Sequence, residues 1–258
     1  MNAAGLWLTA LAPLGVLALV AWAVATARRN AGLVDIFWSL FFLLAALVYA
    51  QGAGGHSARA TVVLGLVAAW AFRLAGHLAV RNWNAPEDHR YVQIRARNEP
   101  GFTWKSVYLV FGLQAVLAWI ISAPLAGAIA SPAPLGFLDA IGAVLAATGL
   151  AIEAIADYQL ARFKADPANA RAVMDRGLWR YSRHPNYFGE FCVWWGFYAI
   201  AIAAGAEWTV FAPFLMSVLL LRVSGVALLE RDIGDRRPAY RQYIARTNAF
   251  FPGPARGP

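Results

Sequence analysis

The fold is decided where a polar stretch, DRGLWRYSRHPNYFGE at residues 175–190, runs directly into an apolar one, FCVWWGFYAIAIAA at residues 191–204. The first is dense in cations and hydrogen-bonding side chains, whereas the second has the character of a membrane helix. Ionisable groups at the mouth of a membrane helix cost free energy unless they hold something, so they indicate a functional site by default. The junction therefore predicts a membrane protein with a polar site at one membrane face.

Composition extends this interpretation to the whole chain. The 258 residues are 60% hydrophobic and only 14% charged, which is more apolar and less charged than an ordinary soluble domain. The length suits one compact bundle better than several domains, so we expect a single all-α membrane domain over residues 1–258. The one cysteine, Cys192, excludes an intrachain disulfide and a paired-cysteine metal site.

Seven segments are long and apolar enough to cross a bilayer, since a span needs about 20 mostly apolar residues. They are residues 5–27, 33–51, 60–80, 105–123, 135–157, 187–205 and 208–229. Arg59 alone falls in the connectors after the even-numbered spans, and Arg73 and Arg222 lie within spans. The remaining Lys and Arg lie in or beside the connectors that follow odd-numbered spans. Positive-inside insertion then puts the N-terminus outside and the C-terminus in the cytosol, in the cytoplasmic membrane if the source is bacterial.

Missing patterns exclude several classes of protein. The chain has no G-x-G-x-x-G after a strand, no Walker A sequence and no G-x-S-x-G elbow. Its four histidines lack metal-ligand spacing, so we expect no metal. The cations flank membrane helices, which predicts contact with the lipid bilayer and not with nucleic acid. We infer no obligate protein partner, and we expect the Pro/Gly-rich end, residues 252–258, to fray.

Acidic side chains at membrane depth are the first candidate groups. Asp35 lies near the start of the second span, where it is either a helix-start acid favoured by the helix dipole or a functional carboxyl. Glu153 and Asp157 are four residues apart and share one face of the fifth span. They are either paired structurally with a buried arginine or part of a site.

The start of the sixth span predicts an anion site. Pro185 suits the first turn of a helix, and the exposed backbone N–H groups of that turn attract negative charge. Arg180, Arg183 and His184 stand beside this helix end, and Asn186 and Glu190 follow it. We expect a phosphate or pyrophosphate here, with a simple helix cap as the alternative.

Several segments together resemble a known family. They are Glu153-x-x-x-Asp157-Tyr158, RFKADPAN at residues 162–169, RGLWRYSRHPNYFGE at 176–190, Glu87-Asp88-x-Arg90-Tyr91, and SGVALLE at 224–230. This pattern is similar to the bacterial branch of the steroid 5α-reductase superfamily, 3-oxo-5α-steroid 4-dehydrogenase-like proteins long named only as a domain of unknown function. The R-H-P-x-Y part is shared with isoprenylcysteine carboxyl methyltransferases. A methyltransferase using S-adenosylmethionine is therefore one alternative, and a non-catalytic lipid carrier or transporter is another.

The resemblance implies a seven-helix oxidoreductase that uses NADPH to reduce the C=C bond of an enone in a steroid or related isoprenoid lipid. It implies Asp35 and Tyr91 as the catalytic acid and phenol at the substrate ketone. Glu153 stands where animal relatives have Asn. The implied cofactor-binding residues are Glu87, Asp88, Arg90, Glu153, Asp157, Arg162, Lys164, Arg171, Arg180, Tyr181, His184, Asn186, Tyr187, Glu190, Arg222 and Glu230. We expect these groups to converge in one site that is open to the cytosol and to the bilayer.

Overall fold

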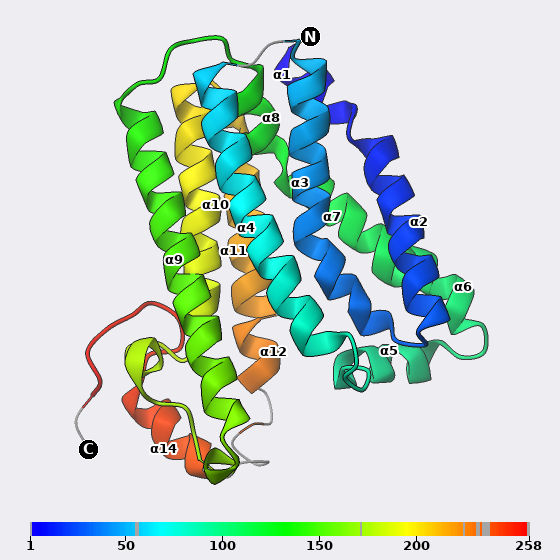
Figure 1. Cartoon of the computed structure of the whole chain (residues 1–258), viewed down its shortest axis with the longest axis vertical. Helices are drawn as coiled ribbons and strands as arrows, with labels where there is room; N and C mark the ends of the chain where they lie inside the picture. Colours follow the sequence, from blue (N-terminus) through cyan, green and yellow to red (C-terminus); the bar gives the residue numbers. More distant parts are fainter. Residues whose placement is uncertain are drawn as a thin grey trace. The chain divides into compact units, whose positions relative to one another are not determined.

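The computed structural model describes residues 2–54, 57–170, 172–223, 225–230, 233 and 238–256. Every regular element among these residues is helical, as the composition predicted (Figure 1). Six helical segments are long and apolar enough to cross a membrane. The chain is therefore an integral, multi-pass membrane protein.

The six segments correspond to six of the seven expected spans. They are Ala3–Ala27, Ala31–Gly52, Ala58–Asn82, Phe102–Ile121, Phe137–Ala165 and Glu207–Glu230. Their boundaries lie close to the expected ones, except that the fifth continues to Ala165 instead of ending at residue 157. The last two turns of this helix are polar, with Arg162 and Lys164 in the final one, so the apolar pattern stops before the helix ends.

The remaining expected span, residues 187–205, forms helix α10 (Pro185–Ala203). This helix is not among the six, because Asn186 and Glu190 interrupt its apolar character near the start. Its crossing of the membrane and the orientation of the two termini stay predictions.

The chain divides into two compact units. Unit 1 comprises Met1–Asp139 and Ile200–Ala212, and unit 2 comprises Ala140–Ala199 and Pro213–Pro258. Helices α9 (Phe137–Ala165), α10 and α11 (Phe211–Val218) each run from one unit into the other. The expectation of a single domain over the whole chain stays a prediction.

Unit 1 is built around two long helices that lie side by side, α3 (Val34–Gly52) and α4 (Ala58–Asn82) (Figure 1). Phe42 of α3 contacts the ring of Trp70 of α4 edge to face, with centroids 5.6 Å apart. The other elements of unit 1 are α1 (Ala3–Leu8), α2 (Leu11–Ala27), η1 (Ala31–Leu33), α5 (His89–Asn98), α6 (Phe102–Ser106), η2 (Val107–Gly112), α7 (Leu113–Ile121), α8 (Ala123–Ala130) and η5 (Glu207–Val210).

Two features of unit 1 were not expected from the sequence. Helix α8 is buried over residues 123–129 and is too short to register as a span. Arg59, which the charge pattern treated only as an isolated cation, is 1% exposed and forms an ion pair with Asp139 at 2.7 Å. Its guanidinium also donates to the carbonyl oxygens of Ala133 and Pro134. It thereby fixes the connector before α9, and its role there is structural.

In unit 2, α9 and α10 approach so closely that glycine is required at the contact. A Cβ atom on Gly149 would lie 2.5 Å from the carbonyl oxygen of Gly189, and one on Gly189 would lie 2.6 Å from that of Gly149. Small residues at helix crossings allow such backbone approach in membrane proteins. The remaining elements of unit 2 are η3 (Pro167–Asn169), η4 (Gly177–Arg180), η6 (Leu219–Val223), α12 (Val226–Glu230) and α14 (Ala239–Arg246).

The C-terminal segment makes several contacts with the rest of unit 2. The backbone N–H of Gly253 donates to the carbonyl of Tyr181 at 3.0 Å, and that of Arg256 donates to Arg246 at 2.8 Å. The ring of Phe250 packs edge to face on Phe191 of α10 at 5.6 Å. Backbone hydrogen bonds therefore attach Gly253 and Arg256 to the fold, and the fraying expected for residues 252–256 stays a prediction. Residues 257 and 258 lie outside the described part of the chain.

In the part of the chain that the structure describes, unit 1 contains the π-helical segment η2 and unit 2 contains the π-helical segment η6. A Cβ atom on Gly112, at the end of η2, would lie 2.9 Å from the carbonyl oxygen of Val107. A Cβ atom on Gly225, after η6, would lie 1.8 Å from that of Leu220. Both widened turns therefore depend on a glycine, and π segments in helices are frequent at functional sites.

Candidate functional site

Asp35 and Tyr91 are in direct contact in unit 1. The Tyr91 hydroxyl donates to Asp35 Oδ1 at 2.6 Å, and Arg90 Nη2 donates to Asp35 Oδ2 at 3.1 Å. The Gln114 amide donates to the Tyr91 oxygen at 3.3 Å. We call these residues, with Asp88, the Asp35 cluster. The structure thus brings together two residues that lie far apart in sequence and that were expected at one ketone.

Local capping explains how α5 is positioned against α3. Asp88 caps α5, because its Oδ1 accepts from the backbone N–H of Arg90 at 2.9 Å. Glu87 reaches the chain just before α3, where it accepts from the N–H of Ala31 at 2.6 Å. Glu87 also pairs with Arg95 at 2.8 Å. The Glu87-Asp88 dipeptide therefore starts one helix and ties it to the beginning of another.

Burial and charge keep Tyr91 in its protonated form. Burial, the charge of Asp35 and the hydrogen bond to Asp35 together hold the pKa of Tyr91 well above its usual value. Burial alone would lower the pKa of Arg90, but Asp35 and Asp88 raise it above the ordinary range. Gln114 Oε1 is buried and has no hydrogen-bond partner among the described residues. The cluster is therefore a neutral donor beside a fixed cation, with one acceptor left unused.

The acidic face of the fifth span lies in unit 2. Glu153 and Asp157 are both buried. Asn186, in the first turn of α10, donates from its amide to Asp157 Oδ1 at 3.1 Å. Glu190 lies one turn further along α10 and is also buried. Close packing of α9 on α10 thus brings Asn186 against Asp157, and the convergence of all the expected cofactor groups in one site stays a prediction.

Glu230 organises a second ionic group, the Glu230 cluster of Arg183, His184 and Glu230. The Arg183 guanidinium donates to both carboxylate oxygens of Glu230 at 2.7 Å. His184 Nε2 lies 2.9 Å from Glu230 Oε1. Arg183 also donates to the carbonyls of Ile244 and Thr247. The side chains of His184 and Glu230 are therefore engaged within the protein, and their expected role toward a cofactor stays a prediction.

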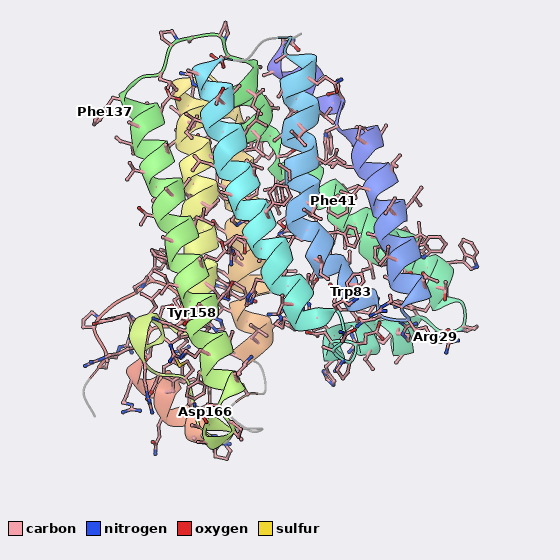
Figure 2. All side chains as sticks on the ribbon, in the orientation of Figure 1. Arg29, Phe41, Trp83, Phe137, Tyr158 and Asp166 are labelled. Carbon is pink, nitrogen blue, oxygen red and sulfur yellow. The ribbon has the colours of Figure 1, made fainter. Side chains whose placement is uncertain are left out.

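The other cofactor candidates are at or near the surface. Arg162 is exposed and donates to the Tyr158 hydroxyl at 3.3 Å (Figure 2). Tyr187 stacks on the His184 ring with centroids 5.6 Å apart. Lys164, Arg180, Tyr181 and Arg222 are also exposed, whereas Arg171 lies outside the described residues. Exposed cations of this kind suit a phosphate group.

Gln114 was missed at the level of sequence, and Arg183 was given a different partner from the one that the structure shows. Gln114 is an isolated amide in an apolar span, and a polar side chain at membrane depth is itself a signal. Arg183 was considered for an anion, whereas its guanidinium binds Glu230. Among the described residues no group of three or more His, Cys, Asp or Glu side chains is arranged to hold a metal ion.

Comparisons with known proteins complete the description of the site. The chain is 26% identical over 265 residues to an uncharacterized protein of Schizosaccharomyces pombe, and the match covers 90% of this chain and 76% of that protein. No solved structure matches the chain significantly. The family model described as a protein of unknown function, DUF1295, matches residues 21–247. These residues include both the Asp35 and the Glu230 clusters, and the chain belongs to the DUF1295 family.

Proposed function

We propose that this protein reduces the C=C bond of an enone in a steroid or related isoprenoid lipid, with NADPH as the reductant. The observation that carries the proposal is the 2.6 Å hydrogen bond from Tyr91 to Asp35, at the start of an apolar helix. A phenol oriented by a carboxyl group is a suitable hydrogen-bond donor to a ketone. The membrane location suits a substrate that dissolves in the bilayer.

In the proposed reaction, the Asp35 cluster stabilises the negative charge that develops on the ketone oxygen of the substrate. Addition of hydride at the β-carbon moves electron density onto the ketone oxygen. The Tyr91 hydroxyl, turned from Asp35 toward that oxygen, stabilises the developing enolate by donating a hydrogen bond, and a proton taken from water then adds at the α-carbon. Asp35 and Gln114 orient the phenol, and Arg90 holds the carboxyl group in place. Trp38, one helical turn after Asp35, provides an apolar surface for a ring system.

Unit 2 carries groups that fit a phosphorylated dinucleotide. Exposed cations in the last turn of α9 and shortly before α10 suit its phosphates, and Lys164 and Arg180 are the candidates for the additional phosphate of NADPH. Asn186 and Asp157 already share a hydrogen bond and offer an amide and a carboxylate to polar groups. When bound, the reduced nicotinamide supplies the hydride.

The decisive experiment distinguishes a role of Tyr91 in turnover from a role in binding the cofactor. Purified full-length protein is given NADPH and a Δ4-3-ketosteroid, and loss of the reduced nicotinamide absorbance is followed. We expect Tyr91→Phe to lower kcat by about 100-fold, because it removes the hydrogen-bond donor to the developing enolate, with the KM for NADPH nearly unchanged. Tyr108→Phe is the matched control, since Tyr108 is an exposed tyrosine of the same unit. Wild-type kcat in Tyr91→Phe would remove Tyr91 from the mechanism.

The cofactor assignment has its own test. Direct binding measurements should give a lower Kd for NADPH than for NADH, because cations can contact the additional phosphate. Lys164→Gln and Arg180→Gln should narrow this difference. Equal affinity for the two dinucleotides, or tight binding of S-adenosylmethionine in their place, would contradict the reductase and favour a methyltransferase.

A further inference from the structure

A cavity of about 410 Å³ opens in unit 1 beside the end of α2. Its volume falls within the roughly 300–1,000 Å³ range of small-molecule sites. The wall contains two guanidinium groups, Arg29 and Arg95, and the hydroxyls of Thr26, Thr103 and Ser106. Phe102 and Phe111 form its apolar part. Cations and hydroxyl donors beside an apolar surface are suited to an anionic group attached to a hydrophobic chain.

Arg29 is held in a backbone conformation that normally selects glycine. Its φ is 51°, in the left-handed region. The N–H of Arg29 donates to Thr26 and that of Asn30 to Ala25, which is the hydrogen-bond pattern of a Schellman motif at the end of α2. Glycine is the usual residue at this position, and an arginine there costs free energy relative to glycine. Strain of this kind at a cavity indicates a functional use of the side chain.

The guanidinium groups differ in how far the fold already engages them. Arg95 uses Nε and Nη2 to bind Glu87, and it lies over the Phe102 ring at 4.6 Å. The Arg29 guanidinium is exposed and makes no hydrogen bond or ion pair within the described part of the chain. Arg29 is therefore the cation that remains available to an anion in the cavity (Figure 2).

The cavity lies at the end of an apolar segment that is long enough to cross a membrane. Arg29 directly follows the apolar segment Ala3–Ala27. The Trp22 indole donates to the carbonyl of Thr103 at 2.8 Å and lies 5.2 Å from the Trp104 ring. Trp104 is 71% exposed. Exposed tryptophan at the end of a span marks the membrane–water interface, independently of which side that interface faces.

We infer that this cavity binds the phosphate group of an anionic membrane phospholipid, with Arg29 as its principal cation. The hydroxyl groups of Thr26 and Thr103 and the Nη1 of Arg95 supply further donors, whereas the Ser106 hydroxyl already donates to the carbonyl of Thr103 at 2.7 Å. The acyl chains would lie along the apolar surface of α2. Basic pockets between membrane helices bind anionic headgroups in this way. The inference is independent of the proposed reductase activity.

The test uses purified full-length protein in detergent, titrated with dioleoyl-phosphatidylglycerol and followed by native mass spectrometry and by the rise in Tm that a bound ligand gives. Arg29→Gly should raise the apparent Kd for this lipid about tenfold, the loss expected for one charge-assisted contact at a partly exposed site. Its Tm without lipid should equal or exceed that of the wild type, because glycine relieves the left-handed strain. Arg29→Lys should retain most of the affinity.

Controls distinguish the phosphate lipid from other occupants. Arg97→Gln changes an exposed arginine that does not line the cavity and should leave the Kd unchanged. Dioleoylglycerol, which has the same chains without phosphate, should not compete. Equal binding of dioleoylglycerol, or an unchanged Kd in Arg29→Gly, would overturn the inference. Saturation of the cavity by inorganic phosphate alone would assign it to a free anion and overturn the lipid assignment.

Discussion

The Asp35 cluster of unit 1 and the Glu230 cluster of unit 2 are built from the same parts but are satisfied to different degrees. In each, an arginine and the next residue along the chain contact one carboxylate, Arg90 and Tyr91 in the first and Arg183 and His184 in the second. Arg183 makes two 2.7 Å hydrogen bonds to Glu230, whereas Arg90 makes a single hydrogen bond of 3.1 Å to Asp35. This difference indicates that Arg183 and Glu230 form a structural ion pair, whereas the Asp35 cluster remains able to bind a ligand.

Burial supports the same distinction. The side chain of Arg183 is 8% exposed, and that of Arg90 is 31% exposed. The remaining donors of Arg183 are taken by backbone carbonyls, whereas the Asp35 cluster retains the unused acceptor of Gln114. A buried polar network contributes most to rigidity when it is fully satisfied. An incompletely satisfied one is better placed to receive a ligand.

The largest expected effect comes from breaking the satisfied cluster. Arg183→Met should lower the free energy of unfolding by about 3 kcal/mol, because it leaves Glu230 without its main partner in a largely buried site. In a chain of this size this corresponds to a Tm lower by about 9 °C in thermal unfolding of the detergent-solubilised protein. Arg176→Met, at an exposed arginine nearby, is the control. A loss in Arg183→Met no larger than in this control would contradict a structural role.

Sequence reasoning predicted the helices well because hydropathy is a local property that survives folding. It placed six spans close to their observed bounds. It missed α8, which is apolar but shorter than a span, and both π segments, for which Gly112 and Gly225 are the only local signal. Short buried helices and π-helical turns depend on contacts with distant parts of the chain. The local sequence does not reveal those contacts.

Contacts between residues far apart in the chain were harder to predict from the sequence than the helices were. Asp35 and Tyr91 were placed together by family resemblance, since no spacing rule connects residues on different helices. Arg59 and Asp139 were not paired in advance, although both are ion-paired and almost fully buried. The distribution of Lys and Arg predicts on which side of the membrane Arg59 lies. It does not predict that Asp139 accepts the hydrogen bonds of Arg59, which only the structure shows. Acid and base pairing therefore required the structure, whereas the periodicity of charges on one helix did not.

A second, smaller effect tests how the polar groups of unit 2 are positioned. Gly189→Ala should lower the free energy of unfolding by about 2 kcal/mol, since the new Cβ would lie 2.6 Å from the Gly149 carbonyl oxygen. The Tm should fall by about 6 °C. Gly65→Ala introduces the same methyl group where nothing lies within 4 Å, and it should leave the Tm unchanged or slightly higher. Equal Tm values for the two variants would show that α9 and α10 tolerate a wider separation.

The smallest stability effect, and the sharpest test of the comparison, is the same substitution in the other cluster. Arg90→Met should lower the free energy of unfolding by only about 0.5–1 kcal/mol, or roughly 2 °C in Tm, because its ion pairs with Asp35 and Asp88 are both partly solvated. Arg97→Met, on the same helix, is the control for removal of an exposed cation. If Arg90 holds the Asp35 carboxyl for catalysis, kcat should nevertheless fall about tenfold, through loss of orientation of Tyr91. A Tm loss as large as that of Arg183→Met would erase the distinction between the clusters, because Arg90 would then serve the fold as Arg183 does.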